Sequence, residues 1–384
     1  MIKLNPIYII TGAIITGAAG FLGNNIVRIL LQQNKGEVRA LVLPGDDLIS
    51  LNGLDCEIVK GNVLEKESLL PLFHDDEGRE VFVIHCAGAV DIASGYSSKV
   101  YDVNVEGTRN VCQICLEKQA KLVYISSVHA MAPTETSEGI LPAKTYNPDE
   151  VPGLYAKVKA RASQIVLDTV SRGLHACLVQ PSGLIGPYDY SNSNLTQFIV
   201  ETANEKLPAC VSAGYSFVDV RDATMAIINA CENGKDGISY LVAGPTTSMM
   251  EIAKMVSEDN HSRPVRFCIP LGLVEAVTPL TTLYYRYTRQ KPLFTSFAVR
   301  TLETPSNFNI TSSQQDLCFH PRPLKDTIHD TVAFLKSIFR IDTDSVIENG
   351  KPVSETGNSK ALFYLAGIAA GLAGLSLLNR KRKS

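Results

Sequence analysis

A glycine-rich turn near the amino terminus constrains the fold of this chain more than any other feature. The octapeptide Thr16–Gly23, TGAAGFLG, begins at the last residue of the apolar run Ala13–Thr16 and opens a helical pattern. In a strand–turn–helix unit, Gly17 permits the tight turn, Gly20 lets the backbone approach a pyrophosphate, and Gly23 lets the helix pack closely on the strand. The positive end of the helix would then face the phosphates. A purely structural turn is the alternative that the glycines alone leave open.

Short β-branched runs alternate with helical patterns over the first two thirds of the chain, which predicts an α/β fold. Several runs are almost continuously apolar, as strands covered on both faces must be. We therefore expect a Rossmann-type, doubly wound parallel sheet. Its predicted strands are Ala13–Thr16, Val38–Leu43, Glu57–Lys60, Val81–His85, Lys121–Ser126 and His175–Gln180, and its helices include Leu22–Gln33 and Val103–Lys118.

The chain divides into a core, a small lobe and a tail. We predict a dinucleotide-binding core at 7–180, followed at 181–340 by the remaining core strands interleaved with a small C-terminal substrate lobe. Clusters of Pro, Gly, Asn and Ser after Pro181 indicate the lobe. Residues 341–360 are polar and predict a flexible linker.

The carboxyl-terminal end predicts an apolar helix at 361–378, with a basic tail at 379–384. At about 1.5 Å per residue, this uncharged segment is just long enough to span a bilayer. We expect it to anchor a cytosolic catalytic domain to a membrane, and expect a cytoplasmic protein otherwise. The alternatives are a helix docked on the protein's own surface and a cell-wall sorting signal at Glu355-Thr356-Gly357. The second lacks its Leu-Pro and a preceding export signal.

Charge and cysteine usage narrow the class of protein. A net charge of -3 gives no basic face for nucleic acid, so we expect no DNA or RNA partner. Nine scattered cysteines, with no signal peptide in Met1–Pro6, favour a reducing compartment. Cys112 and Cys115 form a CxxC without a second ligand pair. We interpret them as helix residues and expect no metal site.

A YxxxK pair and a serine pair form the candidate catalytic set. In a helix, Tyr155 and Lys159 lie one turn apart on the same face. A nearby ammonium favours a phenolate, so we expect Lys159 to lower the pKa of Tyr155 and allow proton exchange with a substrate hydroxyl or carbonyl. Ser126 and Ser127 end the preceding strand. As isolated residues they could simply terminate that strand.

Further segments resemble those of extended short-chain dehydrogenases/reductases, the NAD-dependent epimerase/dehydratase superfamily, over residues 10–338. The likeness is greatest to the dihydroflavonol-reductase-like and 3β-hydroxysteroid-dehydrogenase-like branch. The segments are Gly61-Asn62-Val63, His85-Cys86-Ala87-Gly88, Asn104-Val105-Glu106-Gly107-Thr108, Pro181–Pro187, Phe217–Asp222 and Phe319–Leu324. Two departures are Asn62 in place of the usual Asp, and Gln180 in place of an arginine. The latter puts the substrate-side contacts in question.

The resemblance assigns roles to individual residues. It implies that Ser127, with Ser126 as fallback, hydrogen-bonds the reacting oxygen and that Tyr155 and Lys159 carry the proton transfer. Asn104 would support the relay or only tie down a helix kink. The implied cofactor-binding residues are Gly17, Ala19, Gly20, Phe21, Leu22, Gly23, Asn62, Val63, Cys86, Ala87, Gly88, Tyr155, Lys159, Pro181 and Ser182.

The cofactor is expected to be NAD or NADP. Asp46 and Asp47, after the second strand, would repel a 2′-phosphate if they face it, which slightly favours NAD. They could equally be solvated loop residues.

The predicted reaction interconverts a secondary alcohol and a ketone on a moderately apolar small molecule, and the protein could form a homodimer. The alternatives are a non-catalytic NAD(P)-sensing protein and a sugar-nucleotide epimerase or dehydratase. For the latter, the basic candidates are Arg263, Arg266, Arg286 and Arg289.

Overall fold

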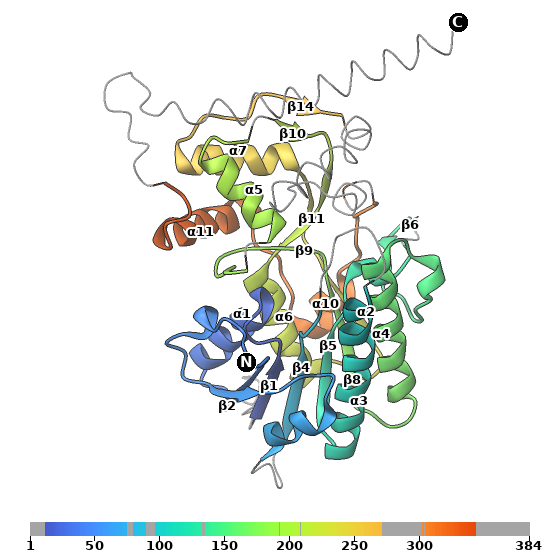
Figure 1. The fold of residues 1–384 in the computed structure, drawn as a ribbon. Coiled ribbons are helices and arrows are strands. Elements are labelled where there is room, and N and C mark those ends of the chain that lie inside the picture. The colour runs from blue at the N-terminus through green and yellow to red at the C-terminus, as the bar shows by residue number, and fades with distance from the viewer. Residues whose placement is uncertain are drawn as a thin grey trace, which may run out of the picture.

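A seven-stranded parallel sheet forms the centre of the molecule (Figure 1). The computed structural model describes residues 12–342 except 75–79, 90–96, 133–134, 192, 208, 271–301 and 303. The spatial order is β3-β2-β1-β4-β5-β8-β12, and every neighbouring pair is parallel. These strands are β1 (Gly12–Thr16), β2 (Glu37–Val42), β3 (Glu57–Lys60), β4 (Val81–His85), β5 (Lys121–Ile125), β8 (Ala176–Pro181) and β12 (Ser239–Val242). The predicted Rossmann-type sheet is confirmed, and its order reverses between β1 and β4.

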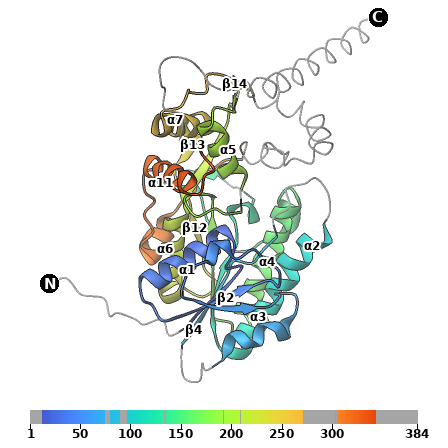
Figure 2. The same ribbon diagram turned by 60° about the vertical axis from the view of Figure 1, so that its left-hand side comes forward.

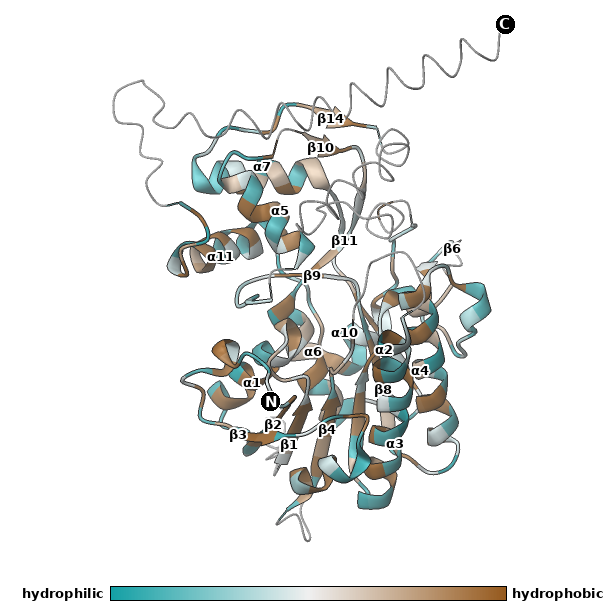
Figure 3. Ribbon diagram, viewed as in Figure 1, coloured by the Kyte–Doolittle hydropathy of each residue, from teal (hydrophilic) through white to brown (hydrophobic). Residues whose placement is uncertain are grey.

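Helices cover both faces of this sheet (Figures 1 and 2). One face packs against α1 (Phe21–Gln32) and α6 (Val220–Asn233), and the other against α3 (Gly107–Lys118) and α4 (Leu154–Val170). Successive strand residues point to opposite faces. In β1, Ala13 and Ile15 pack with α1 and α6, whereas Ile14 packs with α3 and α4. The central strands must therefore be largely apolar, as the brown colour of β4 in Figure 3 shows.

A smaller lobe lies beyond the carboxyl ends of the sheet strands (Figure 1). The chain enters it directly after β8, since the first lobe strand, β9, begins at Gly183. The lobe contains β9 (Gly183–Ile185), β10 (Cys210–Val211), β11 (Gly214–Asp219), β13 (Thr246–Ser248) and β14 (Cys268–Ile269), with α5 (Asn194–Ala203), α7 (Met249–Asn260) and α11 (Leu324–Ser337). Shorter elements are α2 (Ser98–Tyr101), β6 (Glu135–Thr136), β7 (Gly139–Ile140) and α10 (Thr311–Leu317).

The predicted helix Val103–Lys118 is not uniform. It consists of a π-helical segment, Asp102–Glu106, continued by α3. Such segments frequently occur at functional sites. Cys112 and Cys115 are buried in α3 as ordinary helix residues.

Among the helices that the structure describes, none is both long enough and apolar enough for a bilayer crossing. The predicted apolar helix at 361–378, the basic tail and the linker from residue 343 onward lie outside the described residues.

Candidate active site

The glycine-rich turn follows β1 and leads into α1. Gly17 has a φ of +67°, and a Cβ there would lie 2.8 Å from the backbone of Ala87. A Cβ on Gly23 would lie 2.2 Å from the carbonyl oxygen of Gly17. Gly23 therefore allows close packing of the helix on the turn itself, and not on the strand as predicted. A Cβ on Gly20 would meet only the Gly17 oxygen, at 3.2 Å.

The amino terminus of α1 is suited to an anion. Gly20 occupies the N-cap position, so no side chain caps the helix, and its first turn contains no acidic residue. The first-turn N–H groups of a helix have no partner within the helix and carry the positive end of its dipole. Ala19, Phe21 and Leu22 are half-buried beside them. These features fit the pyrophosphate of a dinucleotide.

Two buried asparagines of α1 hold this turn against the start of the lobe. The Asn24 side chain donates to the carbonyl oxygen of Tyr188 at 3.1 Å, and that of Asn25 donates to Pro187 at 3.3 Å. The sequence interpretation missed both residues. Two consecutive asparagines on the buried side of an amphipathic helix were the available signal.

Ser127 and Tyr155 meet at the carboxyl edge of the sheet. The Ser127 hydroxyl accepts from the backbone N–H of His129 at 3.2 Å. Burial raises the pKa of Tyr155, and a hydrogen bond from Ser127 opposes this by lowering it. Our expectation of a lowered Tyr155 pKa was therefore wrong for the free site, because burial outweighs the favourable contacts.

Ser126 points elsewhere. Its hydroxyl lies 2.6 Å from the Ser163 hydroxyl, which itself donates to the carbonyl oxygen of Lys159 at 2.8 Å. Ser126 thus ties the end of β5 to α4. Ser127 is the serine whose side chain contacts Tyr155.

Lys159 lies on α4 one turn after Tyr155 and is only 6 % exposed. Its ammonium donates to the carbonyl oxygen of Ile125 at 2.9 Å and lies 5.3 Å from the centroid of the Tyr124 ring. Burial lowers the pKa of Lys159 to about 8. A positive charge held there at neutral pH costs folding free energy.

Lys159→Met is accordingly expected to raise the free energy of unfolding at about pH 7 by about 1–3 kcal/mol. Because the pKa falls from 10.5 to about 8 on folding, the native protein binds fewer protons than the unfolded chain between these values. The stability of the wild type should increase as pH rises through this window, and the variant should lose that increase. Urea unfolding at about pH 7 and about pH 10 measures both effects. Lys157→Met, an exposed position on the same helix, is the control; a Lys159→Met variant less stable than wild type near neutral pH contradicts the expectation.

Asn104 lies in the π-helical segment and is 1 % exposed. Its Nδ2 donates to the carbonyl oxygens of Ala89 and Val100, both at 2.8 Å, which ties down the helix kink. Its Oδ1 has no hydrogen-bond partner among the described residues. A Cβ on Gly88 would lie 2.9 Å from this oxygen and 3.6 Å from Lys159 Nζ. The two hydrogen bonds of Nδ2 therefore account for the kink, and Oδ1 remains available as an acceptor beside Lys159.

A buried hydrogen-bond chain connects β1, β4 and α3 beneath the site. Thr16 Oγ1 lies 2.7 Å from His85 Nδ1, and His85 Nε2 lies 3.1 Å from Thr108 Oγ1. Because the Thr108 hydroxyl donates to the Asn104 carbonyl oxygen at 2.6 Å, it must accept from His85 Nε2–H. Burial lowers the His85 pKa to about 3, so the ring is neutral. The register of β1 and β4 places His85 directly opposite Thr16.

The remaining predicted nucleotide residues lie at the same edge of the sheet. Asn62 Oδ1 accepts from the N–H of Leu64 at 3.1 Å, the turn-forming contact that an aspartate would make. A Cβ on Gly107 would lie 2.7 Å from Val63, so α3 packs directly on this turn. Cys86 and Ala87 follow β4 and are half-buried. Pro181 ends β8, and Ser182 accepts a hydrogen bond from Ser216 of β11 at 3.1 Å.

Gln180 is completely buried, so it does not face a substrate. Its Nε2 donates to the Ser127 carbonyl oxygen at 3.0 Å, and its Oε1 accepts from the Tyr146 hydroxyl at 3.0 Å. Gln180, which stands where the family commonly has an arginine, thus holds the backbone of Ser127 in place.

Asp46 and Asp47 are solvent-exposed. Their carboxylates accept from the N–H groups of Leu43 and Ile49, each at 3.0 Å, and so shape the loop after β2.

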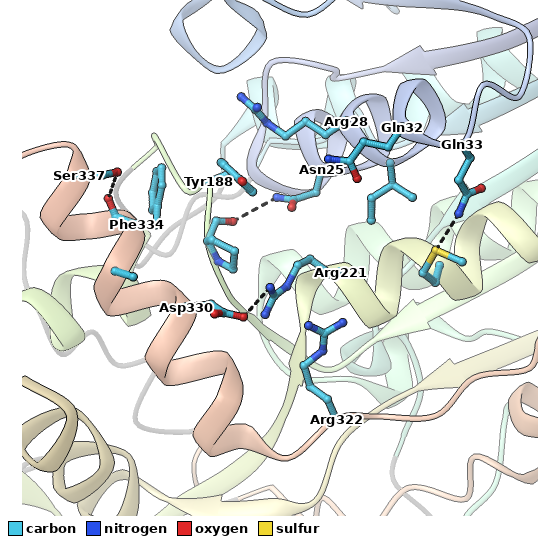
Figure 4. Close-up of a pocket in the computed structure, with 14 residues that line it drawn as sticks. Asn25, Arg28, Gln32, Gln33, Tyr188, Arg221, Arg322, Asp330, Phe334 and Ser337 are labelled. Atoms are coloured by element: carbon cyan, nitrogen blue, oxygen red, sulfur yellow. Dashed lines mark hydrogen bonds and ion pairs between the residues drawn. The ribbon is translucent and has the colours of Figure 1, made fainter.

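A separate cavity of about 680 Å³ lies between α1, α6 and α11 (Figure 4). Ser127, Tyr155 and Lys159 do not line it. Two of its three arginines are paired with carboxylates: Arg221 bonds Asp330 at 2.6 Å, and Arg322 bonds Asp222 at 2.7 Å. The third, Arg28, donates to the carbonyl oxygen of Ser50 at 2.8 Å. We interpret these ion pairs as a clamp between the lobe and the core.

The fold and the site define a Rossmann-fold nucleotide-binding protein with a Ser-Tyr-Lys set beside its glycine-rich turn. Residues 13–243 match the model of the NAD dependent epimerase/dehydratase family. The chain belongs to this family, which confirms the resemblance seen in the sequence, and it is a nicotinamide-dependent oxidoreductase of the short-chain dehydrogenase/reductase type.

Similar proteins agree with this assignment. The chain is 28% identical over 326 residues to sterol demethylase protein B of Methylococcus capsulatus, which covers 84% of this chain and 98% of the relative. It is 30% identical over 188 residues to 3 beta-hydroxysteroid dehydrogenase type 7 of Homo sapiens, covering 45% of this chain and 50% of the relative. The solved structure of gox2253 is 27% identical, has a TM-score of 0.70, and is matched over 86% of this chain and 99% of its own.

Proposed function

We propose that this protein interconverts a secondary alcohol and a ketone on an apolar substrate of the hydroxysteroid class. The observation that carries the proposal is the contact between the hydroxyls of Ser127 and Tyr155, one helical turn from the buried Lys159. This arrangement supplies a positioned acid–base group and a hydrogen-bond donor for one oxygen atom. The names of two relatives, a sterol demethylase protein and a hydroxysteroid dehydrogenase, support the substrate class.

The chain's own residues would act in the following way. The turn from Gly17 to Gly23 would hold the pyrophosphate of NAD or NADP, which when bound supplies the hydride acceptor. Tyr155 would take the proton of the substrate hydroxyl as the C–H bond breaks, and Ser127 would orient the same oxygen. The ammonium of Lys159 would stabilise the phenolate form of Tyr155. Asn104 Oδ1 could hold a water beside Lys159 for return of the proton to solvent.

The charge arrangement gives less support to the epimerase or dehydratase alternative, which needs basic groups for a nucleotide diphosphate. Arg263 forms an ion pair with Glu205 at 3.4 Å, Arg266 is exposed to solvent, and Arg286 and Arg289 lie outside the described residues. Arg221 and Arg322 are also paired with carboxylates. We therefore favour a substrate without a diphosphate.

Substrate and cofactor class can be tested together. Purified protein incubated with a 3β-hydroxysteroid and NAD should show an increase in NADH absorbance. This increase should be faster than the increase in NADPH absorbance with NADP as the cofactor. Flavonoid ketones with the reduced cofactors and nucleotide sugars with NAD complete the panel. Turnover of nucleotide sugars alone would refute the proposed substrate class, and a faster reaction with NADP would refute the preference for NAD.

We further propose that residues 361–378 attach the enzyme to a membrane, as an apolar segment between Lys360 and a basic end would. Gly367 and Gly371 form a GxxxG that would allow close packing against another helix. The full chain is expected in the membrane pellet after high-speed centrifugation, and a chain truncated after residue 360 in the supernatant. Recovery of both in the supernatant would show that the segment docks elsewhere.

A further inference from the structure

A ring contact joins the catalytic loop of the core to the lobe. His129 lies two residues after Ser127 in the 3₁₀ turn Val128–Ala130, and Tyr215 lies on lobe strand β11. Their rings are stacked, with centroids 5.6 Å apart and planes inclined by 5°, and Tyr215 Oη lies 3.4 Å from His129 Nε2. Tyr215 is 2 % exposed and packs edge-on against Phe217 and Phe308. The lobe therefore holds the His129 ring from one side.

The same histidine also contacts the Ser127 hydroxyl through its backbone. Its backbone N–H donates to Ser127 Oγ at 3.2 Å, which occupies an acceptor site and leaves the hydroxyl proton for Tyr155. Gln180 holds the carbonyl oxygen of Ser127 at 3.0 Å. Ser127 is thus held on its backbone by Gln180 and on its side chain by the turn that carries His129.

The electrostatics place this pair beside Tyr155. Burial raises the pKa of Tyr215, and electrostatic interaction with Tyr155 raises it further, so the two phenols lie near each other. Burial lowers the pKa of His129 to about 4, which keeps its ring neutral near pH 7. Tyr124 on β5 also interacts electrostatically with Tyr155, and Lys159 follows Tyr155 by one turn of α4.

We propose that His129 and Tyr215 are a positioning pair for the reaction: their contact holds Ser127 in the orientation in which it donates to Tyr155. The pair acts through Ser127, and the kinetic part of its role rests on the proposed function. Because one ring comes from the core and the other from the lobe, displacement of the lobe would misalign Ser127 and Tyr155. A change of about 1 Å in such geometry can cost about 100-fold in rate.

Two measurements on the full-length protein test this inference. The first is the titration of Tyr155 without substrate, followed by ¹³C-tyrosine NMR and assigned with Tyr155→Phe. The second is steady-state kinetics with the hydroxysteroid. His129→Ala should move the Tyr155 titration to higher pH, because the hydrogen bond from Ser127 that lowers its pKa is loosened. It should lower kcat about 10- to 100-fold while changing KM for NAD by no more than about twofold. Tyr215→Phe keeps the stacked ring and should have a smaller effect.

Matched controls separate the outcomes. His175→Ala removes an exposed histidine that is paired with Asp236, and should change neither measurement. If His129→Ala does not fold, His129→Gln removes the ring stack with less loss of volume and should shift the titration in the same direction. An unchanged Tyr155 titration in the folded variant overturns the inference. A shifted titration without any steroid turnover by the wild type supports the positioning pair and refutes the proposed function.

Discussion

Tyr155→Phe is expected to remove nearly all turnover while leaving the affinity for the dinucleotide nearly unchanged. The substitution keeps the ring, so packing around the first turn of α4 is preserved, and it removes only the atom that exchanges a proton. Loss of a positioned acid–base group typically costs 10²–10⁴-fold in rate, so kcat should fall by about that factor. Steady-state kinetics measures the fall, and calorimetry with NAD measures the retained binding.

The control for this substitution is Tyr240→Phe. The Tyr240 hydroxyl bonds Asp316 at 3.1 Å on a different part of the fold, so its loss should lower stability without changing kcat. Ser127→Ala adds an independent check. Removal of its hydrogen bond should raise the Tyr155 pKa, so alcohol oxidation should require a higher pH for the same fraction of phenolate. Full activity of Tyr155→Phe would exclude the mechanism.

Most of the sheet could be predicted from the sequence because its central strands are buried on both faces, whereas the edge strand β3 is largely exposed. The bounds of β3 and β4 agree with the predicted Glu57–Lys60 and Val81–His85. The pairing of Tyr155 with Lys159 was equally accessible, because it depends only on helical spacing. Local patterns therefore located the core and the helix that carries the proposed catalytic pair.

The electrostatic state of the site could not be predicted in this way. The Tyr155 pKa depends on burial, to which residues distant in sequence contribute, and the balance between burial and a nearby charge is not visible in spacing. The same holds for His129, whose partner Tyr215 is 86 residues away. Gln180 was misjudged for a different reason. The family resemblance associated its position with substrate contacts, whereas its side chain bonds the backbone of Ser127 inside the protein.

The roles of the glycines required both the sequence spacing and the tertiary structure. Their spacing predicted the turn, but only the structure distinguishes their roles, because a Cβ on Gly23 would overlap the Gly17 carbonyl whereas one on Gly20 would meet a single oxygen at 3.2 Å. Substitution of Gly23 should therefore damage the fold, and substitution of Gly20 should damage binding.

Gly20→Val is expected to weaken NAD binding by about 100-fold or more, since a branched side chain would occupy the space beside the uncapped end of α1 that a pyrophosphate needs. The fold should persist, because a Gly20 Cβ would meet a single atom, the Gly17 carbonyl oxygen at 3.2 Å, and a small shift of the turn relieves that contact. Calorimetry measures the affinity, and thermal unfolding verifies the fold. Gly20→Ala, with a smaller side chain, should show an intermediate loss, and Gly23→Ala should instead lower the unfolding temperature. If Gly20→Val binds NAD as tightly as the wild type, the turn has only a structural role and the dinucleotide must be held elsewhere.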